Sequence, residues 1–149
     1  MLTITQVKSL EEKEKVNHFL EQYAKETLSS DKEYVFMVAK ERGGLTGVGI
    51  FTILPAYATL ENIVIEPIEE AEQLALSIGK AVLNFIDRKN IKKVYAQTCK
   101  NNMNFQNLLQ QLRFTLADKE DEYIQTQDNI ASYFLDLTDY FKKNGCQHR

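Results

Sequence analysis

The sequence contains few of the residues from which metal centres and disulfide frameworks are built. Its 149 residues include two cysteines, Cys99 and Cys146, and two histidines, His18 and His148. Their spacing matches none of the common zinc-binding patterns, so we expect no metal site. Two thiols do not make a disulfide framework, and a reduced, cytoplasmic setting is the default expectation.

Long apolar runs and an excess of positive charge are also missing. No run approaches the roughly 18 apolar residues that a membrane-spanning helix requires, and the N-terminal residues lack the apolar core of a signal peptide. The 18 Lys and Arg are outnumbered by 21 Asp and Glu, which gives a net charge of −3. A mildly acidic chain lacks the broad positive field that holds a phosphate backbone. We therefore expect neither a membrane nor a nucleic acid as partner.

The composition that is present is typical of a globular protein, with 44% hydrophobic and 26% charged residues. No linker, composition shift or internal repeat divides the chain, so we expect a single domain over residues 1–149. A chain of this length buries roughly 68–70% of its unfolded surface, which makes a metal or disulfide staple unnecessary.

Apolar periodicity predicts strands alternating with helices. Strands are expected at residues 1–7, 34–40, 45–54, 58–65 and 92–98, and two more near 121–126 and 132–137. Glycine supplies positive φ at little cost, so Gly43 and Gly44 predict a hairpin turn between the second and third strands.

Three helices are expected between these strands. Ser9 followed by Glu12 is a capping-box pattern that opens a helix over residues 10–28. Pro67 is expected at the first position of a second helix, with Glu69 and Glu70 in its first turn. Asn102 is expected to begin a short third helix.

This order predicts an α+β fold, with a mixed α/β sheet of about six to seven strands and helices on both faces. The strands at 58–65 and 92–98 are joined through a helix, so they should pair in parallel with a right-handed crossover. We expect them to part toward their C-terminal ends.

Four local strings occur within this order of elements: YVFMVAKERGGLTG at 34–47, LENIVIEP at 60–67, VYAQTCKNNMNFQNLLQQLRF at 94–114 and YFLDL at 133–137. The order and the strings together resemble the GNAT N-acetyltransferase family over nearly the whole chain. The strings are similar to the family's hairpin, its V-x-P strand, its strand followed by N-x-x-A-x-x-L-Y, and its closing strand. The resemblance implies transfer of an acetyl group from acetyl-CoA to the amine of a small molecule or peptide.

The family's pyrophosphate-binding signature, R/Q-x-x-G-x-G/A, is poorly matched. The ungapped register places Glu70 at the Arg/Gln position, Gln73 at the first glycine and Ala75 at the last Gly/Ala. A second register uses Ser77 to Lys80, which would shorten the helix by about one turn. We prefer the ungapped register, although Ser77 and Lys80 stay candidates for partial compensation.

The segment around this signature is acidic. No Lys or Arg occurs between residues 62 and 79, whereas Glu66, Glu69, Glu70 and Glu72 are present. Acidic residues stabilise the start of a helix, but they repel a pyrophosphate placed there. We therefore expect acetyl-CoA to bind weakly.

The resemblance implies a general base on the strand at 58–65, where Glu61 is the candidate. The alternative is that Glu61 is a solvent-facing strand residue. Backbone N–H groups around Ile63 and Ile65 are expected to hold the acetyl oxygen. Strand alternation predicts that Glu61 shares a face with these two residues.

Asn102 matches the family asparagine that contacts the pantetheine region, and an N-cap is an equally good interpretation. Phe105 replaces a small alanine where the cofactor arm would pass. Leu109 replaces the tyrosine that protonates the leaving thiolate, and it cannot donate a proton. The general acid stays open among Tyr95, Tyr123 and Tyr133.

The alternative to an enzyme is a non-catalytic binding or regulatory module with the GNAT fold, and an unrelated α+β ligand-binding domain is a third reading. The degenerate loop and Leu109 favour the module, whereas Glu61 and Asn102 favour the enzyme. The acceptor is unidentified because acceptor-site loops vary most. A homodimer also stays open.

Overall fold

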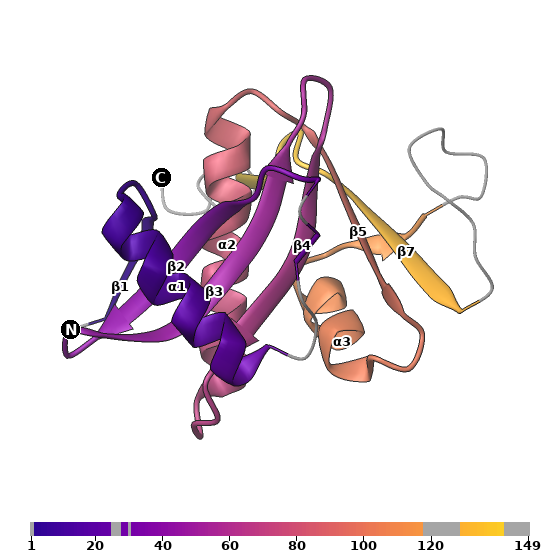
Figure 1. Ribbon diagram of the computed structural model, residues 1–149. Coiled ribbons are helices and arrows are strands. Elements are labelled where there is room, and N and C mark those ends of the chain that lie inside the picture. The colour runs from indigo at the N-terminus through magenta and orange to yellow at the C-terminus, as the bar shows by residue number, and fades with distance from the viewer. Residues whose placement is uncertain (1, 25–27, 30, 118–128, 142–149) are drawn as a thin grey trace, which may run out of the picture.

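A computed structural model describes residues 2–24, 28–29, 31–117 and 129–141 (Figure 1). In these ranges seven strands form one sheet, and three helices pack against it. The elements are β1 (Thr3–Gln6), α1 (Leu10–Tyr23), β2 (Val35–Glu41), β3 (Gly44–Ile53), β4 (Ala58–Ile65), α2 (Ala71–Arg88), β5 (Lys93–Cys99), α3 (Met103–Gln111), β6 (Thr115–Leu116) and β7 (Ile130–Asp136).

The sheet is mixed, with the strand order β1-β2-β3-β4-β5-β7-β6. Each neighbouring pair is antiparallel except β4 and β5, which are parallel. Parallel pairing joins Ala58 to Val94 and Thr59 to Tyr95, and it does not extend to the later residues of either strand. The predicted parallel pair, and its separation toward the C-terminal ends, is thus confirmed.

Helices cover both faces of the sheet, as predicted (Figure 1). Helix α1 packs Val16, Phe19 and Leu20 against the face formed by β2, β3 and β4. The larger core lies on the other face, where α2 and α3 pack. The buried residues of α2 are Leu74, Ile78, Gly79, Val82, Leu83 and Ile86.

Glycines on β3 let α2 approach the sheet closely. A Cβ atom on Gly49 would lie 2.7 Å from Ile78 Cγ2 and 3.0 Å from Val82 Cγ2. Within α2 itself, a Cβ atom on Gly79 would lie 2.6 Å from Leu112 Cδ1. Gly79 therefore lies inside the helix, as the ungapped register predicted, and it makes room for the end of α3.

The predicted helix caps at Ser9 and Asn102 are present. The Ser9 side chain accepts the backbone N–H of Glu12 at 3.1 Å, and the Asn102 side chain accepts that of Phe105 at 3.2 Å. Each cap satisfies an N–H group for which the first turn offers no carbonyl.

Helix α2 begins at Ala71, so the prediction that Pro67 opens it is wrong. The chain makes a turn first, in which the Ala71 N–H donates to the Ile68 carbonyl at 3.2 Å. Proline fixes φ at a value that suits a turn as well as a first helical position. Glu69 consequently precedes the helix, Glu70 is its N-cap residue, and its first turn contains one acidic residue, Glu72.

One other boundary differs from the sequence prediction. Helix α1 ends at Tyr23 and not at Leu28, because Ala24 has an extended backbone with ψ of 139°. The strand expected near 121–126 lies outside the described residues. Strand β7 pairs with the short strand β6, at Thr115–Leu116, which the sequence did not predict. Among the described residues, no helix is both long enough and apolar enough to cross a membrane.

Candidate functional site

A cleft of about 1300 Å³ opens where β4 and β5 part. Its walls are residues 61–65 of β4, residues 97–99 of β5 and much of α3 with the segment before it. The C-terminal end of α1 and the start of α2 complete it, through Tyr23, Ala24, Ala71 and Glu72. The cleft follows from the short parallel pairing of β4 and β5. Each of these strands is held on its other side by an antiparallel neighbour, so the two part where their own pairing ends.

Six of the residues singled out from the sequence line this cleft. They are Glu61, Ile63, Ile65, Ala75, Asn102 and Phe105. The other three, Gln73, Ser77 and Lys80, are exposed on α2 and are not among its lining residues. Lys80 is the tenth residue of α2, so it lies well beyond the first turn. The compensation expected from Ser77 and Lys80 thus has no geometric basis here.

A β-bulge carries Glu61 to the α1 side of the sheet. Ile50 lies opposite Asn62 and Phe51 lies opposite Leu60, which leaves Glu61 as an extra residue. Such a bulge reverses the alternation of side chains along the strand. Glu61 therefore also borders a small pocket with Leu20 of α1 and Ala24, the C-cap of that helix.

The hydrophobic residues that follow the bulge face the other way. Ile63 and Ile65 pack against the core on the α2 side of the sheet. The prediction that Glu61 shares their face is wrong, because it assumed an unbroken alternation. The bulge was not visible in the sequence, since it is defined by the register against β3.

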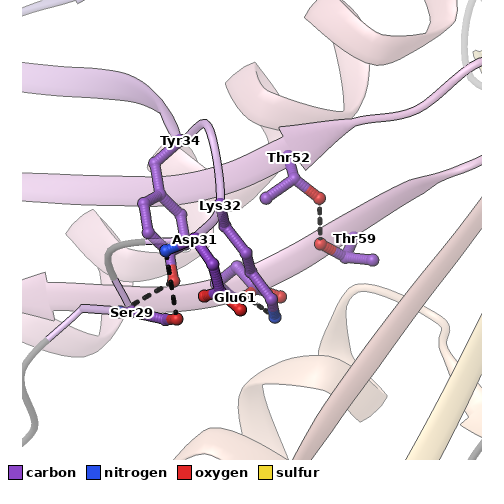
Figure 2. Close-up of polar contacts among 7 residues, drawn as sticks. All are labelled: Ser29, Asp31, Lys32, Tyr34, Thr52, Thr59 and Glu61. Atoms are coloured by element: carbon purple, nitrogen blue, oxygen red, sulfur yellow. Dashed lines mark hydrogen bonds and ion pairs between the residues drawn. The ribbon is translucent and has the colours of Figure 1, made fainter.

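The Glu61 carboxylate is paired with an ammonium from the segment before β2 (Figure 2). Lys32 Nζ lies 2.9 Å from Glu61 Oε1, and the side chains are 52% and 22% exposed, respectively. This hydrogen bond is the main cause that raises the pKa of Lys32 above its usual value of 10.5. Glu61 thus stands at the border of the cleft with a primary ammonium already bound to it.

A second polar feature lies one residue further along β4. The backbone N–H of Ile63 donates to Asn62 Oδ1 at 2.9 Å. Ile63 is one of the residues whose N–H was expected to hold the acetyl oxygen. That donor is satisfied within the chain by a neighbouring carboxamide.

The charge of the cleft is negative. Its described lining residues include the carboxylates of Glu61 and Glu72 and no Lys, Arg or His. Two described helices, α2 and α3, line the cleft with their N-terminal residues and so bring the positive ends of their dipoles to it. Glu72 lies in the first turn of α2. An anionic pyrophosphate would therefore meet backbone N–H groups without a cationic side chain among these residues.

The wall formed by α3 is fixed by one buried carboxamide. Gln106 Nε2 donates to the carbonyl of Lys100 at 2.8 Å and to that of Cys99 at 3.3 Å. The Tyr133 hydroxyl donates to Gln106 Oε1 at 3.0 Å. The amide side chain therefore ties β7 and α3 to the segment that leaves β5. This network was not found from the sequence, because it joins residues far apart in the chain.

The same network bears on the choice of a general acid. Tyr133 is 2% exposed and Tyr95 is 4% exposed, and neither lines the cleft. Leu109 is fully buried in the core. Tyr123 lies outside the described residues. Tyr23, which the sequence analysis did not consider, is a tyrosine that does line the cleft.

Several other lining residues were missed. The string KNNMN after β5 was interpreted only as the start of a helix, yet most of it lines the cleft. Its run of asparagines was the available signal, since amide side chains offer both donors and acceptors to a ligand. The missed polar lining residues of β4, β5, α3 and the segment between β5 and α3 are Asn62, Gln97, Thr98, Cys99, Asn101, Asn104, Asn107, Gln110 and Gln111.

Comparisons with known proteins find similarity in structure only. No protein-family model matches the sequence, and no curated protein matches it. Many solved structures do share its fold. One is the ribosomal-protein-S18-alanine N-acetyltransferase from Escherichia coli, with a TM-score of 0.73 at 16% identity, covering 92% of this chain and 94% of that one.

Two further structures extend the comparison. The spermidine/spermine N-acetyltransferase from Vibrio cholerae has a TM-score of 0.71 at 12% identity, covering 96% of this chain and 98% of that one. A GNAT family acetyltransferase from Elizabethkingia anophelis with acetyl-CoA bound has a TM-score of 0.62 at 14% identity, covering 91% and 98%. The chain therefore has the GNAT fold, as its sequence resemblance implied. At these identities the likeness establishes the fold alone.

Proposed function

We propose that this protein transfers an acetyl group from acetyl-CoA to a primary amine in the cleft between β4 and β5. The observation that carries the proposal is the position of Glu61, a carboxylate at the border of a cleft between parting parallel strands. Structures with this fold include acetyltransferases, one of them with acetyl-CoA bound. The acceptor is a small molecule or a peptide amine.

The residues that line the cleft suit the pantetheine arm of acetyl-CoA better than its pyrophosphate. The parting strands and the amide side chains around Asn102 offer donors and acceptors for the amides of a pantetheine arm. The start of α2 offers N–H groups to the pyrophosphate, as helix N-termini do in other proteins. Glu72 opposes it there, and no described lining residue is a cation. We therefore propose weak binding of acetyl-CoA.

Acetyl-CoA supplies the activated acetyl group, and the side chains of this protein handle the proton. An acceptor amine arrives as an ammonium, so it must lose a proton before it can attack. Glu61 is the proposed base, and Lys32 Nζ, 2.9 Å from it, demonstrates that a primary ammonium fits against this carboxylate. The Ile63 N–H is the proposed donor to the acetyl oxygen once Asn62 releases it.

A non-catalytic binding module is the second candidate, and the charge of the cleft favours it. Two lining carboxylates, of which Glu61 is already paired with Lys32, and no lining cation among the described residues form a poor site for a pyrophosphate. Such a module would use the same cleft to bind a cationic or neutral ligand without transfer.

Two measurements separate the candidates. Acetyl-CoA at millimolar concentration should raise the melting temperature, because a ligand of the folded state stabilises it by mass action. Thiol release in the presence of a panel of amines, including spermidine and peptides with free N-termini, should then exceed the rate without protein. A thermal shift without thiol release supports the module. The absence of both a thermal shift and thiol release would reject the acetyltransferase proposal.

A further inference from the structure

Three ammonium–carboxylate pairs occur among the described residues, and one differs from the others. Lys40 pairs with Glu12 at 3.1 Å, and Lys92 pairs with Asp87 at 2.5 Å. Neither of those carboxylates lines the cleft. In the third pair the carboxylate is Glu61, which borders the cleft. The lysine of this pair thus brings a primary amine to the place where an acceptor amine is needed.

The segment that carries this lysine is held by local hydrogen bonds (Figure 2). The backbone N–H of Ser29 donates to the Tyr34 hydroxyl at 3.1 Å, and that of Asp31 donates to Ser29 Oγ at 3.5 Å. These contacts hold residues on either side of Lys32, whose own side chain reaches β4 through the ion pair with Glu61. The side chain itself is half exposed, so it can leave the carboxylate and return by rotation about its own bonds.

We propose that Lys32 is an intramolecular acetylation site, at which Nζ accepts the acetyl group of acetyl-CoA bound in the cleft. The inference rests on the proposed function, because it needs the same co-substrate and the same base. A tethered amine has a high effective concentration at the site to which it is tethered. Lys32 should therefore be acetylated faster than a lysine of similar exposure elsewhere on the surface.

The step balances with the groups already named. The Lys32 ammonium transfers one proton to Glu61, and the neutral Nζ attacks the thioester carbonyl carbon. A C–N bond forms and the C–S bond breaks, so the products are acetyl-lysine and CoA thiolate. The thiolate takes a proton from water, and Glu61 returns its proton to solvent. No oxidant or reductant is involved.

Acetylation would change the cleft. The acetylated nitrogen is neutral, so its ion pair with Glu61 is lost. The carboxylate would then be free to bind the ammonium of an external acceptor. Modification of Lys32 would in this way convert a self-occupied site into an open one.

The test follows acetylation of individual lysines in the full chain. The protein is incubated with isotopically labelled acetyl-CoA at several protein concentrations, and acetyl occupancy is measured by peptide mass spectrometry. Lys92 is the matched control, because its side chain is 46% exposed against 52% for Lys32 and it is also paired with a carboxylate. Acetyl phosphate, a donor that needs no CoA site, gives the intrinsic reactivity of each lysine.

With acetyl-CoA, we expect Lys32 to be acetylated roughly tenfold or more faster than Lys92. With acetyl phosphate, we expect no such difference in rate between the two lysines. The rate should be independent of protein concentration and should fall in Glu61→Gln. Equal labelling of the two lysines, the same ratio with both donors, or a rate that rises with protein concentration would overturn the inference.

Thiol release with external amines, measured in parallel, distinguishes a failure of this inference from a failure of the proposed function. If amines are acetylated while Lys32 is labelled no faster than Lys92, the inference fails and the proposed function stands. If acetyl-CoA causes neither thiol release nor a thermal shift, both are rejected. As a check of the assignment, Lys32→Arg should remove the fast label from the intact protein, and Lys92→Arg should leave it.

Discussion

The carboxamide oxygen of Asn62 accepts a hydrogen bond from the backbone N–H of Ile63, at 2.9 Å. In the proposed reaction this N–H is the donor to the acetyl oxygen, so Asn62 competes with the substrate. We expect Asn62→Ala to raise turnover roughly fivefold, since one neutral hydrogen bond contributes about 1 kcal/mol. Steady-state thiol release measures it, and Asn17→Ala, on the exposed side of α1, is the control. Lower turnover in Asn62→Ala would mean that the asparagine assists the reaction.

Glu61→Gln removes the proposed base and keeps the shape of the side chain. Turnover at neutral pH should fall by about 10²–10⁴. Part of the loss should be recovered at high pH, where more of the acceptor amine is already deprotonated. The control is Glu33→Gln, an exposed residue of the segment that carries Lys32. Full activity in Glu61→Gln would leave the reaction without an identified base and favour the binding module.

The acidic start of α2 should limit the affinity for CoA. The double variant Glu70→Arg with Gln73→Gly adds a cation and a small residue at the N-cap and first turn. We expect it to lower the Kd for CoA by several-fold to about tenfold, because charge-assisted hydrogen bonds to phosphate are strong. Calorimetry measures the change in Kd. It is done at a temperature at which the variant stays folded, because glycine in the helix lowers the free energy of unfolding by about 1 kcal/mol.

Lys80→Ala serves as the comparison for that variant. Lys80 is the tenth residue of α2, well beyond the first turn whose N–H groups would meet the pyrophosphate, so its removal should leave the Kd unchanged. Weaker binding in Lys80→Ala, with no gain in the double variant, would instead identify Ser77–Lys80 as the phosphate loop. Low-micromolar affinity in the unmodified protein would contradict the expectation of weak binding.

Gly49→Ala should destabilise the contact between β3 and α2. The added Cβ would lie 2.7 Å from Ile78 Cγ2, an atom of a fully buried β-branched side chain. Overpacking of this kind costs about 1–3 kcal/mol in the free energy of unfolding. Gly44→Ala is the matched control on the same strand, because the nearest atom to its Cβ is 3.9 Å away. Urea unfolding of both variants tests the difference, and equal stability would show that α2 can shift freely.

The ion pair between Lys40 and Glu12 should support the fold at neutral pH and not in acid. The hydrogen bond from Lys40 is the main cause that lowers the pKa of Glu12 below 4.5. A lowered carboxyl pKa gives stability that is complete above the unfolded value and is lost as the pH falls through the folded value. Glu12→Gln should therefore lower the Tm at about pH 7, and the difference should shrink as the pH falls below 4.5 and through the lowered folded-state value. Glu14→Gln, exposed on the same helix, should show no such trend.

Local features of the fold were predictable because they depend on neighbouring residues. The cap at Ser9 needs only Glu12 three residues later, and the hairpin at Gly43 needs only a residue that tolerates the observed φ of 82°. The parallel pairing of β4 and β5 also followed from the sequence, since a helix between two strands of one sheet requires it. The GNAT fold itself was indicated by resemblance, through the order of elements and four local strings, and the solved structures of similar fold confirm it.

The residue at which α2 begins was harder to predict from the local sequence. Proline at residue 67 suits both a turn and a first helical position, so the local signal was ambiguous. The turn from Ile68 to Ala71 decided it, and α2 begins at Ala71. Of the cofactor candidates on this helix, Gln73, Ser77 and Lys80 lie outside the lining of the cleft, whereas Ala75 lines it.

By itself the sequence determined the order of the strands and helices, the caps and the acidic character of the site, because composition and short-range periodicity fix these. The tertiary structure alone decided which face Glu61 occupies and which group it binds. The bulge at Glu61 exists only in the register against β3. Its partner Lys32 lies 29 residues away along the chain, and a contact at that separation is formed by packing of the whole sheet and helix α1, which no local pattern encodes.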